Sequence, residues 1–276
     1  MILVKIFDYD FDSFELNSFQ IDKKAIWEEA GLIYGLYKLG LQERRYELYE
    51  EMLEHISKTE YGSGGYGTHR GYYCPDIYKT VAVGGYNRGK VLKRPTRRSK
   101  ISFEFCYEKE HLVLIKEFEN PSLDFAQQEF IRAEFIERRG NIEIGVRLPF
   151  NRGKVDEFCN EIETIHICQY DAEKLLNVRT FFAKDAHTTD NFTKMNGFEY
   201  EKTWIEYERE QVKTVHYLNY FKPDSWSKEF KSVDKITFLY NSEGIPVQYY
   251  HNDEKDWLYD VSKVNQQYYQ EEYMKK

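Results

Sequence analysis

The stretch ITFLYNSEGIPVQYY, from Ile236 to Tyr250, has two runs of β-branched and aromatic residues on either side of a short polar break. This pattern predicts a β-hairpin with a loop of about two to five residues. The same pattern occurs five times between Ile101 and Asn252, in units that begin at Ile101, Ile131, Ile162, Thr203 and Asp234. The sequence therefore predicts a large antiparallel β meander of up to ten strands in five hairpin units.

The polar breaks place the predicted turns at residues 108–110, 138–141, 171–174, 208–210 and 241–244. Phe103, Phe105 and Tyr107 alternate with other residues along the chain, and this period of two predicts that the three side chains lie on one face of the sheet. The units begin about 30 to 40 residues apart, but no residue is shared by all five, so a true repeat and a plain meander both fit. A sheet of this size should curl strongly, or close, to limit its exposed edges.

Helices are predicted on both sides of the meander. One helical stretch begins at Asp22 and is broken at Gly40, and a second runs from about Gln42 to Ser57, so the short link predicts an N-terminal helical hairpin. The inward apolar residues are Ile26, Ala30, Ile33 and Tyr37 in the first helix and Leu48, Met52 and Ile56 in the second. A C-terminal helix is predicted from Lys255 to Tyr273, with Trp257, Val261, Val264 and Tyr268 in register.

These elements predict an α+β fold dominated by the meander, with the helical hairpin packed on one face or end of the sheet. The predicted regions are residues 1–60, an N-terminal strand and the helical hairpin; residues 61–100, a basic loop region rich in glycine and tyrosine; and residues 101–276, the hairpin ladder with the C-terminal helix. A strand fragment is predicted at Thr80–Val83. The strand near Ile165 is apolar on both sides, which indicates that helices cover part of the sheet.

Composition predicts a cytoplasmic protein with no membrane association. The chain of 276 residues contains no apolar run of about 18 residues, and its opening strand, Met1 to Phe7, is too short for a signal peptide. The cysteines Cys74, Cys106, Cys159 and Cys168 follow no disulfide framework, so reduced thiols are expected. Aromatic residues make up 17% of the chain, which suits broad sheets and, for tyrosine, recognition surfaces.

Charge is distributed unevenly along the chain. The formal net charge is −8, yet residues 61–100 hold nine Lys or Arg and one acid, Asp76, so this stretch carries +8 and the remainder −16. Glycine there allows close backbone approach, and tyrosine and arginine dominate binding hot spots. The stretch is therefore either a surface linker or a binding loop. As a binding loop it would act through Tyr66, His69, Arg70, Tyr72, Tyr73, Arg88, Lys90, Lys93, Arg94, Arg97 and Arg98.

Two features of this basic stretch bear on nucleotides and nucleic acids. Gly84 to Lys90 is glycine-rich but lacks the spacing and the Lys-Ser/Thr ending of a phosphate loop. The run from Lys90 to Lys100 could bind nucleic acid, but the acidic remainder of the chain would repel phosphate. Nucleic acid is therefore disfavoured as a partner.

Catalytic and metal sites have equally weak signals. His166 and Cys168 would face the same side of a strand, but the sequence lacks the further ligands at short paired spacing that zinc requires. His69 and Arg70, with Asp76, form the one cluster that could act as acid and base. No catalytic residue, cofactor or metal ligand is assigned from the sequence.

A small helical N-terminal part, a tyrosine-rich β meander and an acidic chain are together similar in architecture to the immunity proteins of bacterial polymorphic toxin systems, including those with tyrosine-rich β-hairpin repeats. The likeness covers the character of residues 101–252, and no functional residue is carried over from it. It implies cytoplasmic binding of a toxin domain, commonly a basic nuclease, by blockade of its active site. We thus expect a non-enzymatic protein-binding module. The alternatives are an enzyme that acts on nucleic acid or nucleotide with its site in residues 61–100, and a structural or phage-encoded interaction protein.

Overall fold

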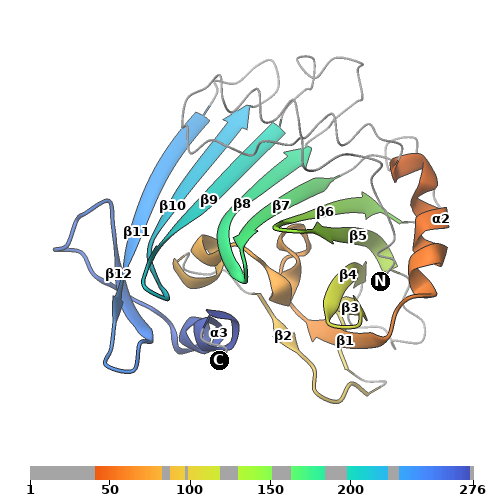
Figure 1. The fold of residues 1–276 in the computed structure, drawn as a ribbon, viewed down its shortest axis with the longest axis horizontal. Coiled ribbons are helices and arrows are strands. Elements are labelled where there is room, and N and C mark those ends of the chain that lie inside the picture. The colour runs from red at the N-terminus through yellow and green to blue at the C-terminus, as the bar shows by residue number, and fades with distance from the viewer. Residues whose placement is uncertain are drawn as a thin grey trace.

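The structure is a computed structural model that describes residues 41–82, 88–96, 99–118, 130–150, 163–183, 198–222 and 230–273. Within these ranges thirteen strands form one antiparallel sheet in the order β13-β12-β11-β10-β9-β8-β7-β6-β5-β4-β3-β1-β2 (Figure 1). The first five strands along the chain are β1 (Lys58–Ser63), β2 (Lys90–Val91), β3 (Phe103–Glu108), β4 (His111–Phe118) and β5 (Phe130–Arg139). The next four are β6 (Ile142–Pro149), β7 (Thr164–Asp171), β8 (Lys174–Ala183) and β9 (Phe198–Glu208). The last four are β10 (Gln211–Lys222), β11 (Phe230–Tyr240), β12 (Pro246–His251) and β13 (Tyr259–Asp260).

All five predicted hairpins are present, as the pairs β3–β4, β5–β6, β7–β8, β9–β10 and β11–β12. Four of their loops have two residues, and the first loop residue lies in the left-handed region, with φ of 58° at Lys109, 56° at Gly140, 52° at Ala172 and 57° at Arg209. A chain reversal of this kind needs positive φ, a conformation whose free energy is higher for a residue with a Cβ than for glycine. The polar breaks of the sequence were therefore correct markers of the turns.

The sheet is larger than the predicted ten strands, because β1, β2 and β13 extend it at its two ends. β1 pairs with β3, with Lys58 opposite Tyr107, and it crosses the predicted boundary between residues 60 and 61. β2 and β13 have two residues each. These strands lack an alternating apolar pattern of their own and form on the edges that longer strands supply.

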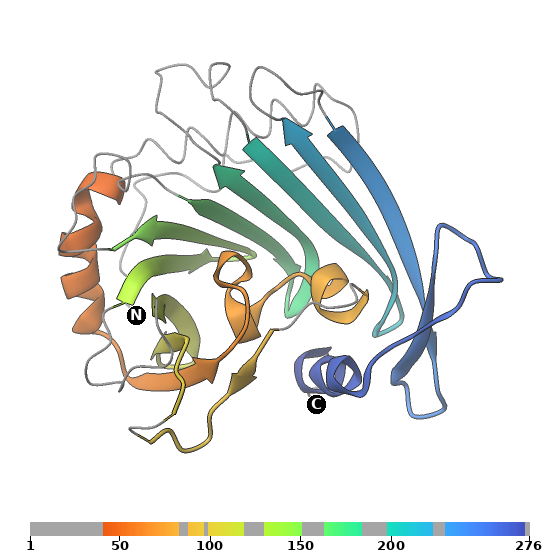
Figure 2. The same ribbon diagram turned by 180° about the vertical axis from the view of Figure 1, so that it is seen from behind.

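The sheet curls strongly, and β3 to β12 sweep around the short helices in residues 67–82 and the C-terminal helix (Figures 1 and 2). No pairing joins β13 to β2 in the described part of the chain, so the sheet is open there. The two-residue strands at both ends leave little free edge for another chain to pair with. The expected curvature is confirmed.

Helices cover both faces of the sheet. α2 (Leu41–Leu53) buries Leu48 and Met52 in a cluster with residues such as Phe135 and Val146 on the outer face. The inner face meets the 3₁₀ turns η2 (Gly67–His69) and η3 (Gly71–Tyr73), the π-helical turn η4 (Tyr78–Ala82) and α3 (Lys263–Tyr273). The first predicted helix, residues 22–40, and the opening strand lie outside the described residues.

Two local predictions were wrong. Thr80–Ala82 lies in η4 instead of a strand, because Asp76 O accepts both the Thr80 amide, at 3.1 Å, and its hydroxyl, at 3.0 Å. The C-terminal helix begins at Lys263, not Lys255, because the preceding residues form turns and β13. Of the apolar positions predicted to share one helix face, Val261 and Tyr268 are buried while Trp257 is 69% exposed.

Candidate functional site

The glycine- and tyrosine-rich segment lies against the inner face of the sheet, and Arg70 holds it there. Arg70 lies between η2 and η3 with φ 61° and ψ 17°, and its side chain is 3% exposed. Its Nε lies 2.6 Å from Glu134 Oε1 and its Nη1 lies 2.6 Å from Glu143 Oε1. A bulky residue in left-handed conformation is strained. The buried carboxylate of Glu134 and the partly buried one of Glu143 provide the compensating interaction.

Glu134 is the more deeply buried of the two partners, at 2% exposure. Burial alone would raise the pKa of its carboxyl, but the positive charge of Arg70, with a contribution from His166, lowers it to about 2. His166 Nδ1 is 3.1 Å from the same Oε1 atom. The carboxylate is therefore ionised at neutral pH, and the cluster is an internal ion pair.

Gly145 on β6 makes room for this pair. A Cβ added there would overlap both Oε1 of Glu134 and Nη2 of Arg70. Glycine inside a strand often marks a close approach of another group to the backbone. The Nη2 atom consequently packs on the backbone of β6.

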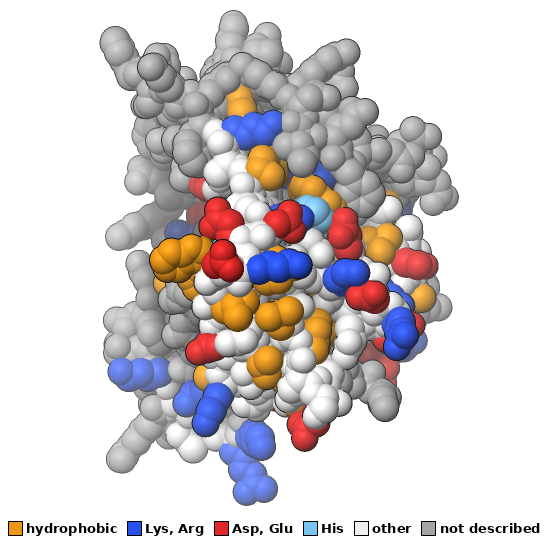
Figure 3. All heavy atoms as spheres, turned by 90° about the vertical axis from the view of Figure 1, so that its left-hand side faces the viewer, with side chains coloured by type: hydrophobic (Ala, Val, Ile, Leu, Met, Phe, Trp, Pro, Cys, Tyr) orange, Lys and Arg blue, Asp and Glu red, His pale blue; other side chains and the backbone are white. Residues whose placement is uncertain are grey.

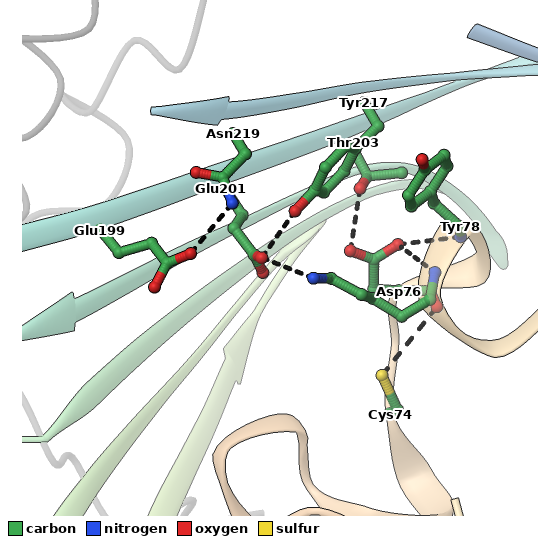
Figure 4. Close-up of polar contacts among 9 residues, drawn as sticks. Cys74, Asp76, Tyr78, Glu199, Glu201, Thr203, Tyr217 and Asn219 are labelled. Atoms are coloured by element: carbon green, nitrogen blue, oxygen red, sulfur yellow. Dashed lines mark hydrogen bonds and ion pairs between the residues drawn. The ribbon is translucent and has the colours of Figure 1, made fainter. Parts of the chain in front are cut away.

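A second buried cluster joins η4 to β9 and β10 (Figure 4). Asp76 accepts a hydrogen bond from the Thr203 hydroxyl at 2.9 Å, while Glu201 Oε1 accepts one from Lys79 at 2.6 Å and one from Tyr217 at 2.6 Å. Burial, together with the nearby charge of Glu201, raises the pKa of Asp76 to about 6. These bonds tie the segment to the sheet at a second position.

The cationic and aromatic residues predicted to bind a partner divide between the interior and the surface. Arg88 is 5% exposed, with its guanidinium carbon 4.2 Å from the Tyr72 ring centre and 3.7 Å from that of Tyr268 on α3. The hydroxyls of Tyr72 and Tyr73 donate to Glu271 and Glu60. These side chains, like Arg70, therefore attach the segment to the rest of the fold.

The remaining predicted residues are differently placed. The His69 ring packs edge-on against Phe182, with ring centres 5.5 Å apart, and burial, with Lys79 nearby, lowers its pKa to about 3. Tyr66 is 51% exposed, and Lys90, Lys93 and Arg94 are exposed as well. Arg97 and Arg98 lie outside the described residues. The predicted set thus does not converge on one surface.

A different surface combines exposed apolar groups with charge. The segment between β12 and α3, which includes the two-residue strand β13, exposes Trp257, Leu258 and Tyr259 by 69%, 47% and 46%. Val264, in the first turn of α3, is 63% exposed. Hydrophobic side chains gather between acidic and basic ones on this side of the molecule (Figure 3). We call residues 252–264 the C-terminal loop surface.

Acidic residues surround these apolar groups. Residues 252–260 contain four acids and one lysine, a net charge of −3. Asp253 pairs with Lys235 at 2.7 Å. In the described part of the chain Glu254 and Asp256 have no ion-pair partner. A Trp-Leu-Tyr run between acids is visible in the sequence, but Trp257 fitted the register of the predicted C-terminal helix, so the run was not predicted as a binding surface.

Other classes of site have little basis in the described ranges. No group of three His, Cys, Asp or Glu there could hold a metal ion. No helix in those ranges is long and apolar enough to cross a membrane. Cys74, Cys106 and Cys168 are buried free thiols, as expected for the described cysteines.

Comparison with protein-family models, with curated proteins and with solved structures finds no match for this chain in any of the three.

Proposed function

We propose that this chain is a non-enzymatic protein-binding module that holds a basic partner domain through the C-terminal loop surface. The observation that carries the proposal is the exposure of Trp257, Leu258 and Tyr259, consecutive residues of the segment between β12 and α3. Tryptophan and tyrosine are enriched among the few residues that supply most binding energy at interfaces. Large apolar side chains exposed together are typical of interaction sites.

The negative charge of the C-terminal loop surface favours a positively charged partner. With a net charge of −3 on residues 252–260 and −8 on the whole chain, the surface complements a basic domain. Complementary charge accelerates encounter and disfavours partners of the same sign. An acidic surface around an aromatic anchor is therefore suited to a basic protein.

Immunity against a toxin domain in the cytoplasm is the most concrete form of this function. It agrees with the resemblance in architecture and with the buried free thiols of Cys74, Cys106 and Cys168. A basic nuclease domain would offer the complementary charge. The alternative, an enzyme acting on nucleic acid or nucleotide through residues 61–100, has less support because Arg70 and Arg88 are buried and cannot contact phosphate at the surface.

Titration calorimetry tests the proposal with the full chain and a basic domain of the protein encoded by the preceding gene, where the proposal places the toxin. We expect one-to-one binding, and we expect Trp257→Ser to weaken it by about 30-fold or more, the loss of about 2 kcal/mol that defines a hot spot. Tyr66→Ser is the matched control, since Tyr66 is an exposed aromatic residue of the basic segment.

Two results would contradict the proposal. The first is unchanged affinity in Trp257→Ser together with a loss in Tyr66→Ser, which would move the binding surface to the basic segment. The second is turnover of nucleic acid or nucleotide by the purified chain, abolished by His69→Ala without unfolding.

A further inference from the structure

A cavity of about 990 Å³ lies on the inner side of the sheet, at the end where the hairpins turn. Its walls come from η3 and the residues after it, from the β7–β8 and β9–β10 turns, and from α3, elements that can be followed in Figure 2. Asp171, Ala172 and Glu173 on its rim are exposed, so the cavity reaches solvent at the turns. Its volume is that of a small-molecule or side-chain binding site.

Tyrosine rings line the cavity, and four of the five lining tyrosines have their hydroxyls engaged. The lining tyrosines are Tyr73, Tyr170, Tyr207, Tyr268 and Tyr269. The hydroxyl of Tyr73 donates to Glu60 at 2.5 Å, that of Tyr207 to Leu175 O at 2.9 Å, and that of Tyr268 to Cys74 O at 2.9 Å. The Tyr269 hydroxyl lies 3.2 Å from that of Tyr240. What these four side chains offer a ligand is therefore the ring.

The charges around the cavity are mostly negative. Four acids and two cations line it. Both cations are paired, Arg70 with Glu134 and Glu143 and Lys174 with Glu210 at 2.9 Å. Asp171 and Glu173 on the rim have no ion-pair partner among the described residues. Two rim carboxylates thus lie in one cavity with tyrosine rings, and a cation complements both kinds of group.

We propose that this cavity binds a guanidinium or alkylammonium group. Such a cation interacts favourably with the face of a tyrosine ring and with a nearby carboxylate. The chain already uses this contact on its own residues, since the Arg138 guanidinium carbon lies 4.3 Å from the Tyr170 ring centre and Lys174 Nζ lies 5.6 Å from that of Tyr207. The group could belong to a free small molecule or to an arginine or lysine side chain of a protein. The proposal does not depend on the C-terminal loop surface.

Calorimetric titration of the full chain at low salt tests this site. The probes are arginine amide and citrulline amide, both with an acetylated α-amino group so that the guanidinium is the one charge that distinguishes them, and a short neutral-capped peptide with one internal arginine. The variant Asp171→Asn/Glu173→Gln removes the two unpaired rim charges, and Tyr207→Leu removes one ring. The matched control is Glu110→Gln/Glu243→Gln, which changes two exposed hairpin-turn acids outside the cavity.

We expect saturable binding of a cationic probe and none of citrulline amide. Either cavity variant should weaken binding by about tenfold, a ring–cation contact being worth about 1 kcal/mol or somewhat more, and the control should bind as the wild type does. Binding of the peptide alone would assign the site to a protein side chain, whereas binding of both cations would also admit free ligands. Absence of binding by both cationic probes, or equal binding of citrulline amide, would overturn the proposal. If Tyr207→Leu unfolds, the rim variant decides the matter, because its residues are exposed.

Discussion

Replacing Glu134 by glutamine should destabilise the fold at neutral pH and have progressively less effect in acid. In the folded protein the pKa of this carboxyl is about 2, against an ordinary value of 4.5. Each unit of pKa difference corresponds to about 1.36 kcal/mol, so the ionised carboxylate contributes about 3 kcal/mol at pH 7. Because the pKa is lowered in the fold, this contribution is complete above the ordinary value and is lost as the pH falls from there toward the folded value.

Glutamine keeps the shape of the side chain and removes its charge, which leaves Arg70 with the carboxylate of Glu143 among the described residues. At pH 7 we expect Glu134→Gln to lower the free energy of unfolding by about 3 kcal/mol, which agrees with the cost of about 3 to 5 kcal/mol for breaking a buried ion pair. Urea unfolding followed by circular dichroism, repeated from pH 7 to pH 3, measures the difference between the two proteins. The difference should begin to narrow below about pH 4.5.

The control for this experiment is Glu173→Gln, an exposed acid that lacks an ion pair within the described ranges. Its stability should follow that of the wild type at every pH, since a surface carboxylate contributes little. A difference below about 1 kcal/mol for Glu134→Gln at pH 7 would refute the reasoning. So would a difference that stays constant down to pH 3, because the Arg70–Glu134 interaction would then not depend on the charge of the carboxylate.

Three further predictions concern stability. Gly145→Ala should lower the free energy of unfolding, measured in urea, by about 2 kcal/mol or more, because the new Cβ overlaps the Arg70–Glu134 pair. The loss should be smaller when the same change is made in the Glu134→Gln variant. If the two losses simply add, the two changes do not act through the same interaction. Ala172→Gly should raise the free energy of unfolding by about 1 kcal/mol and Gly140→Ala should lower it by about the same amount, since both positions have positive φ. A Cβ at Gly140 would have no neighbouring atom within 4 Å, so no steric clash adds to the backbone effect. Equal melting temperatures for the two variants would contradict this prediction. The pKa of His69 is lowered in the fold to about 3 from 6.5, so below pH 6.5 the unfolded chain takes up a proton that the folded chain does not, and the wild type loses stability. His69→Phe should make this loss of stability smaller between pH 6.5 and 4. If the stabilities of the wild type and the variant fall in parallel over that range, the prediction is wrong.

The sequence by itself determined the hairpins, because their causes are local. Alternating apolar residues and a polar break lie within about 20 residues of one another in units such as Ile101–Phe118, and each strand pairs with the next one along the chain. The helix containing Leu48 and Met52 was predictable for the same reason, since its apolar spacing is complete within one segment. β1 lacked such a signal, because it depends on the edge of β3, more than 40 residues away.

The tertiary structure decided which candidate site residues are available to a partner. Arg70 is a typical hot-spot residue by type, but Glu134, 64 residues further along the chain, lies opposite it and makes its burial possible. Trp257 fitted an apolar helix face, yet the chain turns before Lys263 and leaves it exposed. Burial of a charge depends on an opposite charge brought near by the fold, and exposure of an apolar group depends on the absence of a packing neighbour. Both depend on contacts between segments that are distant along the chain. Such contacts cannot be predicted from residue types and their local spacing.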